Sequence, residues 1–82
     1  MPDFFDQMVA AERLRQNQRW GEQNHTPEIW LAILVEEVGE IARAMLEYRF
    51  NEAAKEDIGS ELIQSAAVLH AIWESGRRNG WL

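Results

Sequence analysis

The sequence contains no cysteine, and this absence excludes several kinds of site. A chain without thiols has no disulfide framework, no thiolate metal site and no thiol nucleophile. The absence fits a protein of the reducing cytosol, where disulfides are rare. A structural zinc site is therefore not expected.

Long apolar runs and a surplus of basic residues are missing as well. The longest apolar stretches, such as residues 29–35, are far shorter than the roughly 20 residues of a membrane span, and residues 1–10 lack the pattern of a signal peptide. Fourteen acidic residues against eight basic ones give a net charge of −6, which argues against binding along a nucleic-acid polymer. We therefore expect a soluble, cytoplasmic protein that binds neither membranes nor nucleic-acid polymers.

Proline is scarce, and its two positions indicate helix starts. Pro2 and Pro27 both stand where a helix can begin, and no segment alternates apolar and polar residues as a strand does. The pattern predicts an all-α fold with about three main helices in a single domain, 1–82. The expected helices cover residues 4–19, 27–48 and about 52–75.

Capping residues mark the ends of these helices. Asp3 is predicted as the N-cap of the first helix, the Thr26 hydroxyl as that of the second and Asn51 as that of the third. Gly76 is expected to close the third helix and to leave residues 76–82 as a tail. The short connection between the last two helices favours antiparallel packing.

The second predicted helix carries its acidic residues in an unusual position. At about 100° per residue its apolar side chains form one broad arc, which we interpret as the core stripe: Leu31, Leu34, Val38, Ile41, Ala42 and Met45. Glu37 does not lie opposite this arc, because its neighbours on the helical wheel include Trp30 and Ile33, and Glu40 follows one turn later. Glu37 therefore lies inside the margin of the apolar face.

The third predicted helix repeats this arrangement. Its stripe is formed by Ile58, Leu62, Leu69 and Ile72. Glu61 lies at the edge of that stripe, so that it could face Glu37 and Glu40 across an antiparallel seam. Two carboxylates about 4 Å apart repel by roughly 4 kcal/mol at an effective dielectric constant of about 20, so the cluster must take up protons, turn outward or bind a cation. Oxygen ligands select hard ions, so Mg²⁺ is the expected cofactor and Mn²⁺ a plausible substitute.

Periodicity alone leaves a second interpretation open. Acidic residues on helix faces are mostly solvated and pair with bases one turn away, and Glu36, Arg43 and Glu47 fit that description well. The wheel positions of Glu37 and Glu61 fit it less well. Spacing does not decide between a metal cluster and a solvated face.

The segments "EEVGE" at 36–40 and "ELIQSAAV" at 61–68 resemble the MazG-like all-α nucleoside triphosphate pyrophosphohydrolases. The resemblance extends upstream through "RWGEQNHTPEIWLAIL" and covers roughly residues 19 to 74. In that family a helix with E-E-x-x-E faces a helix with E-x-x-D, and the four acids bind Mg²⁺ for hydrolysis of an NTP or dNTP to its monophosphate and pyrophosphate. The resemblance implies that Glu37, Glu40 and Glu61 are metal ligands. It also implies that Glu36 orients or deprotonates the attacking water.

One position departs from the family pattern, because Gln64 stands where the second motif has aspartate. An amide oxygen can coordinate Mg²⁺ but removes one negative charge from the site. Asp57, one turn before Glu61, is a candidate to compensate for that loss. Two functions follow: an active variant enzyme with Gln64 among its metal ligands, or a non-catalytic nucleotide-sensing or protein-interaction module that has kept the fold.

The segment "WGEQNH" before the second helix offers candidate substrate contacts. Some relatives use aromatic residues there to stack the base, so the resemblance suggests Trp20 for stacking, with Asn24 and His25 as polar contacts. Alternatively, Trp20 closes the core between the first two helices, and His25 serves as a cap or a solvent contact. The sequence leaves the preferred base and sugar undetermined.

A second copy of the chain is expected as a partner. Three helices with two broad apolar faces cannot cover one another fully, and bundles bury such faces with a further helix or a second copy. The resemblance points the same way, because family members assemble as dimers or dimers of dimers. We therefore predict a homodimer that completes a four-helix-bundle type of core.

Overall fold

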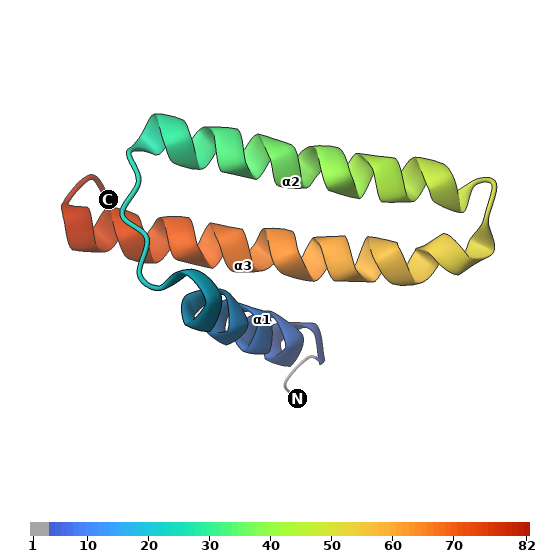
Figure 1. The fold of residues 1–82 in the computed structure, drawn as a ribbon, viewed down its shortest axis with the longest axis horizontal. Coiled ribbons are helices and arrows are strands. Elements are labelled where there is room, and N and C mark those ends of the chain that lie inside the picture. The colour runs from blue at the N-terminus through green and yellow to red at the C-terminus, as the bar shows by residue number, and fades with distance from the viewer. Residues whose placement is uncertain (1–3) are drawn as a thin grey trace.

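The computed structural model describes residues 4–82, and their regular structure is entirely helical (Figure 1). Three long helices, α1 (Phe4–Trp20), α2 (Pro27–Tyr48) and α3 (Lys55–Asn79), follow one another, with a 3-10 turn, η1 (Glu52–Ala54), before α3. The predicted all-α class with three main helices is confirmed. None of the helices in residues 4–82 combines the length and the apolar character that a membrane crossing requires.

Helix α3 is the centre of the arrangement. α2 lies antiparallel along α3, and α1 packs on another side of it (Figure 1). Between the described parts of α1 and α2 there is no close backbone contact. Side chains of α1, α2 and α3 therefore line the space where the three helices converge. The candidate functional site lies in this region.

The predicted start of α2 is confirmed, but the predicted hydroxyl cap is wrong. Pro27 occupies the first turn, and Thr26 precedes it in an extended conformation without a capping hydrogen bond from its side chain. The Thr26 carbonyl instead accepts the backbone N–H of Trp30 at 3.0 Å. Pro27 has no N–H, so the first turn of α2 has one fewer donor that needs a cap.

The cap predicted before the third helix is confirmed. The Asn51 side chain accepts the backbone N–H of Ala53 at 3.1 Å. This bond caps η1, and α3 continues directly from it at Lys55. Asp3, the predicted cap of the first helix, lies outside the described residues.

The predicted end of the third helix is wrong. Gly76 is helical and buried, and α3 continues to Asn79, where Gly80 ends it with a φ of 81°. The chain then folds back, so that the backbone N–H groups of Trp81 and Leu82 donate to the Gly76 carbonyl at 3.1 and 3.2 Å. A Cβ atom at Gly76 would lie 2.5 Å from the Leu82 side chain. Glycine at 76 therefore serves a close approach of the chain end, and glycine at 80 supplies the left-handed stop.

Small side chains fill the contact between α2 and α3, which lets the two helix backbones approach closely. Trp30, only 2% exposed, is the large exception. Its Nε1 donates to Oγ of Ser75, a completely buried serine on α3, at 3.2 Å. The buried apolar residues of residues 4–82 are Val9, Trp30, Ala44, Ala54, Ala67, Val68 and Ala71.

The predicted core stripe of α2 is wrong for the single chain. Leu31 is 61% exposed and Val38 54% exposed, Ala42 and Met45 are also exposed, and Leu34 and Ile41 are half-buried. The buried face is the neighbouring one, which Trp30 anchors on Ser75 and which also carries Ala44. The predicted stripe of α3 is likewise only partly buried, because Leu62 and Leu69 are exposed whereas Ile58 and Ile72 are half-buried.

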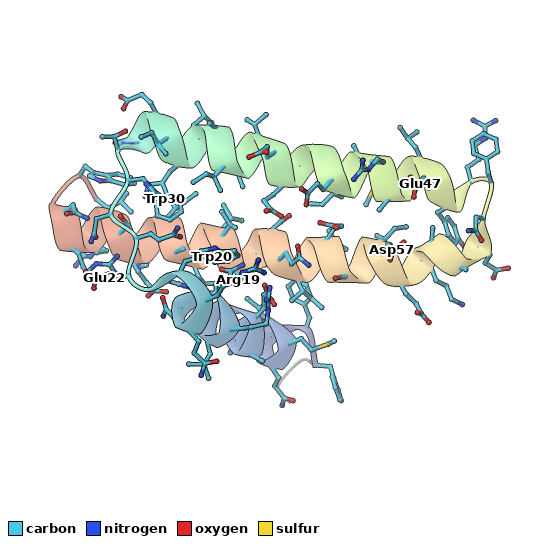
Figure 2. All side chains as sticks on the ribbon, in the orientation of Figure 1. Arg19, Trp20, Glu22, Trp30, Glu47 and Asp57 are labelled. Carbon is cyan, nitrogen blue, oxygen red and sulfur yellow. The ribbon has the colours of Figure 1, made fainter. Side chains whose placement is uncertain are left out.

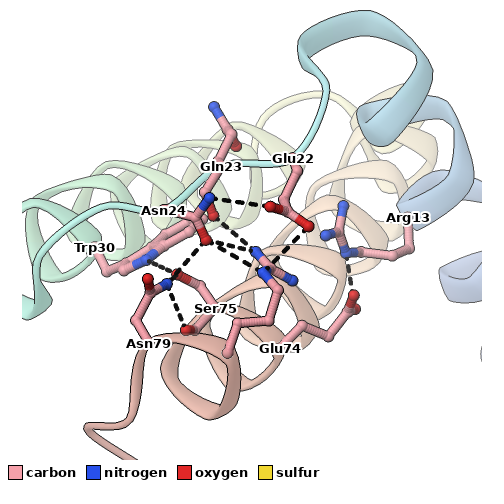
Figure 3. Close-up of polar contacts among 9 residues, drawn as sticks. Arg13, Glu22, Gln23, Asn24, Trp30, Glu74, Ser75 and Asn79 are labelled. Atoms are coloured by element: carbon pink, nitrogen blue, oxygen red, sulfur yellow. Dashed lines mark hydrogen bonds and ion pairs between the residues drawn. The ribbon is translucent and has the colours of Figure 1, made fainter.

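The connection between α1 and α2 is fastened to the end of α3 (Figure 3). Oδ1 of Asn24 accepts hydrogen bonds from Nε of Arg78 at 3.2 Å and from Nδ2 of Asn79 at 2.8 Å. Arg78 also donates to the Gln23 carbonyl at 3.0 Å and forms an ion pair with Glu22 at 3.3 Å. These contacts hold the start of α2 beside the last turn of α3, where Trp30 meets Ser75.

Replacing Ser75 with alanine is expected to destabilise the fold. The substitution leaves the buried indole N–H of Trp30 without its acceptor, and an unpaired buried donor costs about 1–3 kcal/mol. Urea unfolding at a fixed protein concentration measures the difference. Ser60→Ala is the matched control, because Ser60 is an exposed serine of the same helix. A loss for Ser75→Ala no greater than that of the control would contradict this role of the Trp30–Ser75 bond.

Candidate functional site

Three acidic side chains from two helices meet in the seam between α2 and α3. One carboxylate oxygen from each of Glu37, Glu40 and Glu61 lies within 4.8 Å of the other two. All three side chains are half-buried. The sequence predicted this convergence from the helical wheel, and the antiparallel packing of α2 on α3 produces it.

Burial and mutual repulsion change the acidity of this cluster. The pKa of Glu37 is raised above its usual value, first by burial and then by the negative charges of Glu40, Glu36 and Glu12. The pKa of Glu61 is raised by burial and then by Glu40, through a hydrogen bond that only a protonated carboxyl can donate and through charge repulsion. Without a cation, the cluster therefore favours the uptake of protons.

Two oxygens of the cluster lack hydrogen-bond partners. Oε2 of Glu37 and Oε2 of Glu61 are buried and unpaired, and so is the hydroxyl of Ser65, one turn after Glu61 on α3. Buried polar atoms are normally satisfied, so unpaired carboxylate oxygens at a convergence of like charges indicate room for a cation. Three carboxylates offer the oxygen ligands that hard divalent ions such as Mg²⁺ prefer. The residues present therefore fit a metal ion.

The other acids predicted for the site occupy different positions. Glu36 is exposed on α2, next to Glu37 in the chain. Asp57 shares a small hollow with Glu40 and Glu61, and Arg43 lines the same hollow. Figure 2 shows Asp57 on α3 facing the end of α2 that carries Glu47. Asp57 is thus near the cluster, in a hollow that also contains a basic residue.

Gln64 lies on the other side of the cluster, toward α1. Its Nε2 donates to Oγ of Ser60 at 3.2 Å. It lines the same cavity as Glu37. The glutamine therefore borders the space in which a ligand could lie, and the role of its carbonyl oxygen as a metal ligand stays a prediction.

A cavity of about 230 Å³ adjoins Glu37 at the convergence of the three helices. Two tryptophan rings contribute to its apolar wall, which consists of Trp20, Trp30, Ile33, Val68 and Ala71. Its polar wall consists of Glu12, Arg15, Gln16, Gln23, Glu37 and Gln64. A larger hollow of about 550 Å³ between α1 and the start of α3 shares Glu12 and Gln64 but contains no member of the acidic cluster. The smaller cavity is the candidate ligand site, because it is the one of these two that reaches a cluster carboxylate and because it has an apolar aromatic wall, which the small hollow around Asp57 and Arg43 lacks.

The three predicted substrate contacts fall in two places. Trp20, 52% exposed at the end of α1, lines the cavity, and the guanidinium of Arg19 lies 4.9 Å from its ring (Figure 2). Asn24 does not line the cavity, and its side chain is engaged by Arg78 and Asn79. His25 lies edge-on against Trp30, with ring centroids 4.9 Å apart. Asn24 and His25 thus contact the fold itself here, and their contacts with a substrate stay predictions.

The contribution of α1 to the cavity wall was not predicted from the sequence. Glu12, Arg15 and Gln16 follow one another at helical spacing and form one polar edge, in which Glu12 accepts hydrogen bonds from both neighbours. The available signal was this i, i+3, i+4 pattern beside Val9, the only buried residue of α1. It places the three polar residues next to the face that packs on α3.

The substitution Glu37→Gln is expected to raise stability at pH 8 in the presence of EDTA. The folded-state pKa of Glu37 lies above the ordinary value of 4.5, so the ionised form is less favourable in the folded chain than in the unfolded chain. The gain is therefore present above the raised pKa and disappears as the pH falls to 4.5 and below, where both states bind the proton. We expect less than about 1 kcal/mol, because solvent screens partly exposed carboxylates.

Urea unfolding at pH 8 and at pH 4.5 measures this difference. Glu28→Gln is the control, because Glu28 is exposed in the first turn of α2, where a negative charge is favourable. That variant should lose a little stability at pH 8 instead of gaining it. A Glu37→Gln variant that is less stable than the wild type at pH 8, or that shows the same gain at both pH values, contradicts the expected repulsion.

Comparison with models of protein families, with curated proteins and with solved structures found no match to this chain. The acidic cluster, the cavity beside it and the sequence motifs are therefore the basis for a functional assignment.

Proposed function

We propose that the protein is a Mg²⁺-dependent nucleotide pyrophosphohydrolase that converts an NTP or dNTP to its monophosphate and pyrophosphate. The observation that carries the proposal is the convergence of three carboxylates from two helices within 4.8 Å, beside a cavity walled by two tryptophans. A triphosphate bound to Mg²⁺ needs such oxygen ligands, and a nucleobase needs such an aromatic wall. The resemblance of residues 36–40 and 61–68 to the MazG-like motifs supports the same function.

In this proposal the acidic cluster holds the metal ion. Glu37 and Glu61 would offer the oxygens that are buried and unpaired, Glu40 the third carboxylate, and Gln64 a neutral amide oxygen. The chemistry that a bound Mg²⁺ supplies is a lower pKa for water and neutralisation of charge on the phosphate oxygens. Glu36, exposed beside Glu37, is free to orient the attacking water or to accept its proton.

The cavity accommodates the nucleoside part of the substrate in the same proposal. Trp20, which is half-exposed, offers its ring to a base, whereas the almost completely buried Trp30 contributes only to the wall. Glu37 lines the same cavity, so a base held there has its phosphates close to the cluster. Asn24 and His25 lie on the connection that fixes the start of α2 and would influence the base indirectly unless the connection moves. Exclusion of water from the half-buried cluster would strengthen its interaction with charge on the phosphates.

Gln64 supports the alternative of a non-catalytic nucleotide-sensing or protein-interaction module. Its amide brings no charge to the cluster, and its Nε2 is already bonded to Ser60. A site with one negative charge fewer binds Mg²⁺ more weakly. We favour the enzyme, because the three acids that remain converge in the fold.

Pyrophosphate release from a panel of NTPs and dNTPs is the test of the proposed function. We expect release that depends on Mg²⁺ or Mn²⁺ and that falls by at least about 100-fold in Glu37→Gln, because the variant loses a charged ligand. Glu28→Gln, which removes an exposed acid from the same helix, should keep the activity. Binding of nucleotides by the folded protein without pyrophosphate release from any of them would support the non-catalytic module instead.

We also propose that two copies of the chain associate through the exposed apolar face of α2. The radius of gyration is 14.0 Å. A compact chain of this length has a radius of about 12 Å, so the helices do not close into a globular core. The exposed face contains Leu31, Val35, Val38, Met45 and Leu46. A second copy would cover that face with an identical one, in keeping with the two-fold symmetry of most homodimers.

Size-exclusion chromatography with light scattering tests the dimer. We expect twice the chain mass of 9.5 kDa at micromolar concentration. Val38→Glu should shift the protein to the monomer, because a charge buried at an apolar interface is costly. Leu14→Glu, at an exposed apolar residue of α1, is the matched control and should leave the dimer intact. A wild-type protein that elutes as a monomer would contradict the proposal.

A further inference from the structure

A carboxylate of α1 projects into the cavity wall without belonging to the acidic cluster. The side chain of Glu12 is only 12% exposed, and it lines the cavity together with Trp20 and Glu37. Its Oε1 accepts Nε of Arg15 at 2.8 Å, and its Oε2 accepts Nη2 of Arg15 at 2.7 Å and Nε2 of Gln16 at 3.2 Å. The orientation of this carboxylate is thus fixed by three donors.

These three bonds leave Glu12 with acceptor capacity to spare. A carboxylate has about four lone-pair sites, so roughly one site remains, on Oε1. The hydrogen bond from Arg15 holds the pKa of Glu12 below its usual value, so the group stays ionised and accepts without donating. Arg15 and Gln16 keep N–H groups that no bond in this cluster uses, and both line the cavity. The wall therefore presents an acceptor directly beside donors.

The edges of the nucleobases differ in the pattern that fits such a wall. Cytosine and adenine carry an exocyclic amino donor next to an unprotonated ring nitrogen, which is an acceptor. Uracil and hypoxanthine carry the opposite pattern, a carbonyl acceptor next to a ring N–H donor. A carbonyl oxygen of the base cannot form a hydrogen bond with the Glu12 carboxylate, because both groups are acceptors. With the base held in one orientation by stacking and by its phosphates, a site that hydrogen-bonds the amino group disfavours a base that lacks it.

If the Glu12–Arg15 pair served only to stabilise α1, it would not need to lie at the cavity wall. An Arg–Glu pair at i, i+3 stabilises a helix by about 0.2–0.5 kcal/mol when both groups are in water. Glu12 is instead largely withdrawn from solvent, in a cavity that already contains the like-charged Glu37. The hydrogen bond from Arg15 outweighs the effect of burial on the pKa of Glu12, so the carboxylate is held ionised at the cavity wall with an acceptor site open.

We propose that Glu12 is a specificity residue that selects nucleotides whose base carries an exocyclic amino group beside an unprotonated ring nitrogen, as in cytosine and adenine. Its carboxylate accepts from the amino group, and the free N–H groups of Arg15 or Gln16 donate to the ring nitrogen. This inference rests on the proposed function, because it takes the occupant of the cavity to be a nucleotide.

Matched pairs of nucleotides test this selectivity in the wild-type protein. CTP and UTP differ at the position of the amino group and the adjacent ring nitrogen, and so do ATP and ITP. We expect kcat/KM for pyrophosphate release to favour CTP over UTP and ATP over ITP by about tenfold or more. A wild-type preference below about threefold in both pairs, or a preference for UTP and ITP, overturns the inference without any variant.

The variant Glu12→Gln identifies the residue responsible. An amide can accept or donate, so the ratio within each pair should fall below about threefold. The ratio is the informative quantity, because the lost charge near Glu37 changes the rates of both members of a pair together. Glu74→Gln is the control: it removes an acidic partner of an α1 arginine, Arg13, and Glu74 does not line the cavity. An unchanged ratio in Glu12→Gln overturns the role of Glu12.

Binding of the monophosphates separates this inference from the proposed function. Quenching of tryptophan fluorescence by CMP, UMP, AMP and IMP reports base recognition without hydrolysis, since Trp20 and Trp30 line the cavity. If no triphosphate releases pyrophosphate but CMP and AMP bind about tenfold more tightly than UMP and IMP, and Glu12→Gln abolishes the difference, base selection stands and the enzymatic function fails. If pyrophosphate is released but neither the rates nor the monophosphates show the preference, the function stands and base selection fails.

Discussion

The contact of Trp30 with Ser75 sets the rotation of α2 against α3, and the acidic cluster depends on that rotation. The indole is almost completely buried and donates to a hydroxyl that is itself inaccessible to solvent. Residues one and two heptads after position 30 lie on the same face of α2, so Glu37 and Ala44 also turn toward α3. A rotation of α2 by one residue would take Glu37 out of the seam and replace it with Glu36 or Val38, depending on the direction. A tryptophan with a polar atom at its edge resists such a rotation, because the slip would bury its N–H without a partner.

The seam between α2 and α3 contains small residues at one end and carboxylates at its middle. Near Trp30, α3 contributes Ala71 and Ser75, whose short side chains allow the backbones to approach. Farther along, Glu37 and Glu61 occupy the space between the same two helices and leave oxygens that nothing satisfies. Packing alone would favour alanine or leucine there. Side chains that destabilise the fold without a ligand are typical of binding sites, where the ligand supplies the missing interactions.

The sequence predicted the convergence of Glu37, Glu40 and Glu61 because both helix phases could be counted within single helices and the short connection fixed their antiparallel order. It predicted the wrong core face for α2, because that helix has apolar residues on two sides and a hydrophobic wheel cannot tell which side meets the partner helix. Gly76 was mistaken for a helix end because the close approach of Leu82 is a tertiary contact. Glu12 was missed for a related reason: only the packing of α1 on α3 brings it beside Glu37, 25 positions later in the chain.

In the proposed site, α2 and α3 supply the acidic cluster and α1 supplies part of the cavity wall, and the packing of the helices explains this division. α2 and α3 are locked together along their whole length, as a cluster that must hold its oxygens in fixed positions requires. α1 contacts α3 alone and is joined to α2 through a connection fastened by Arg78. Polar residues on such a helix can change the shape and hydrogen-bonding pattern of the cavity without moving any member of the acidic cluster. In a bundle of this kind, recognition of the base can therefore vary through α1 while the chemistry of the phosphates stays with α2 and α3.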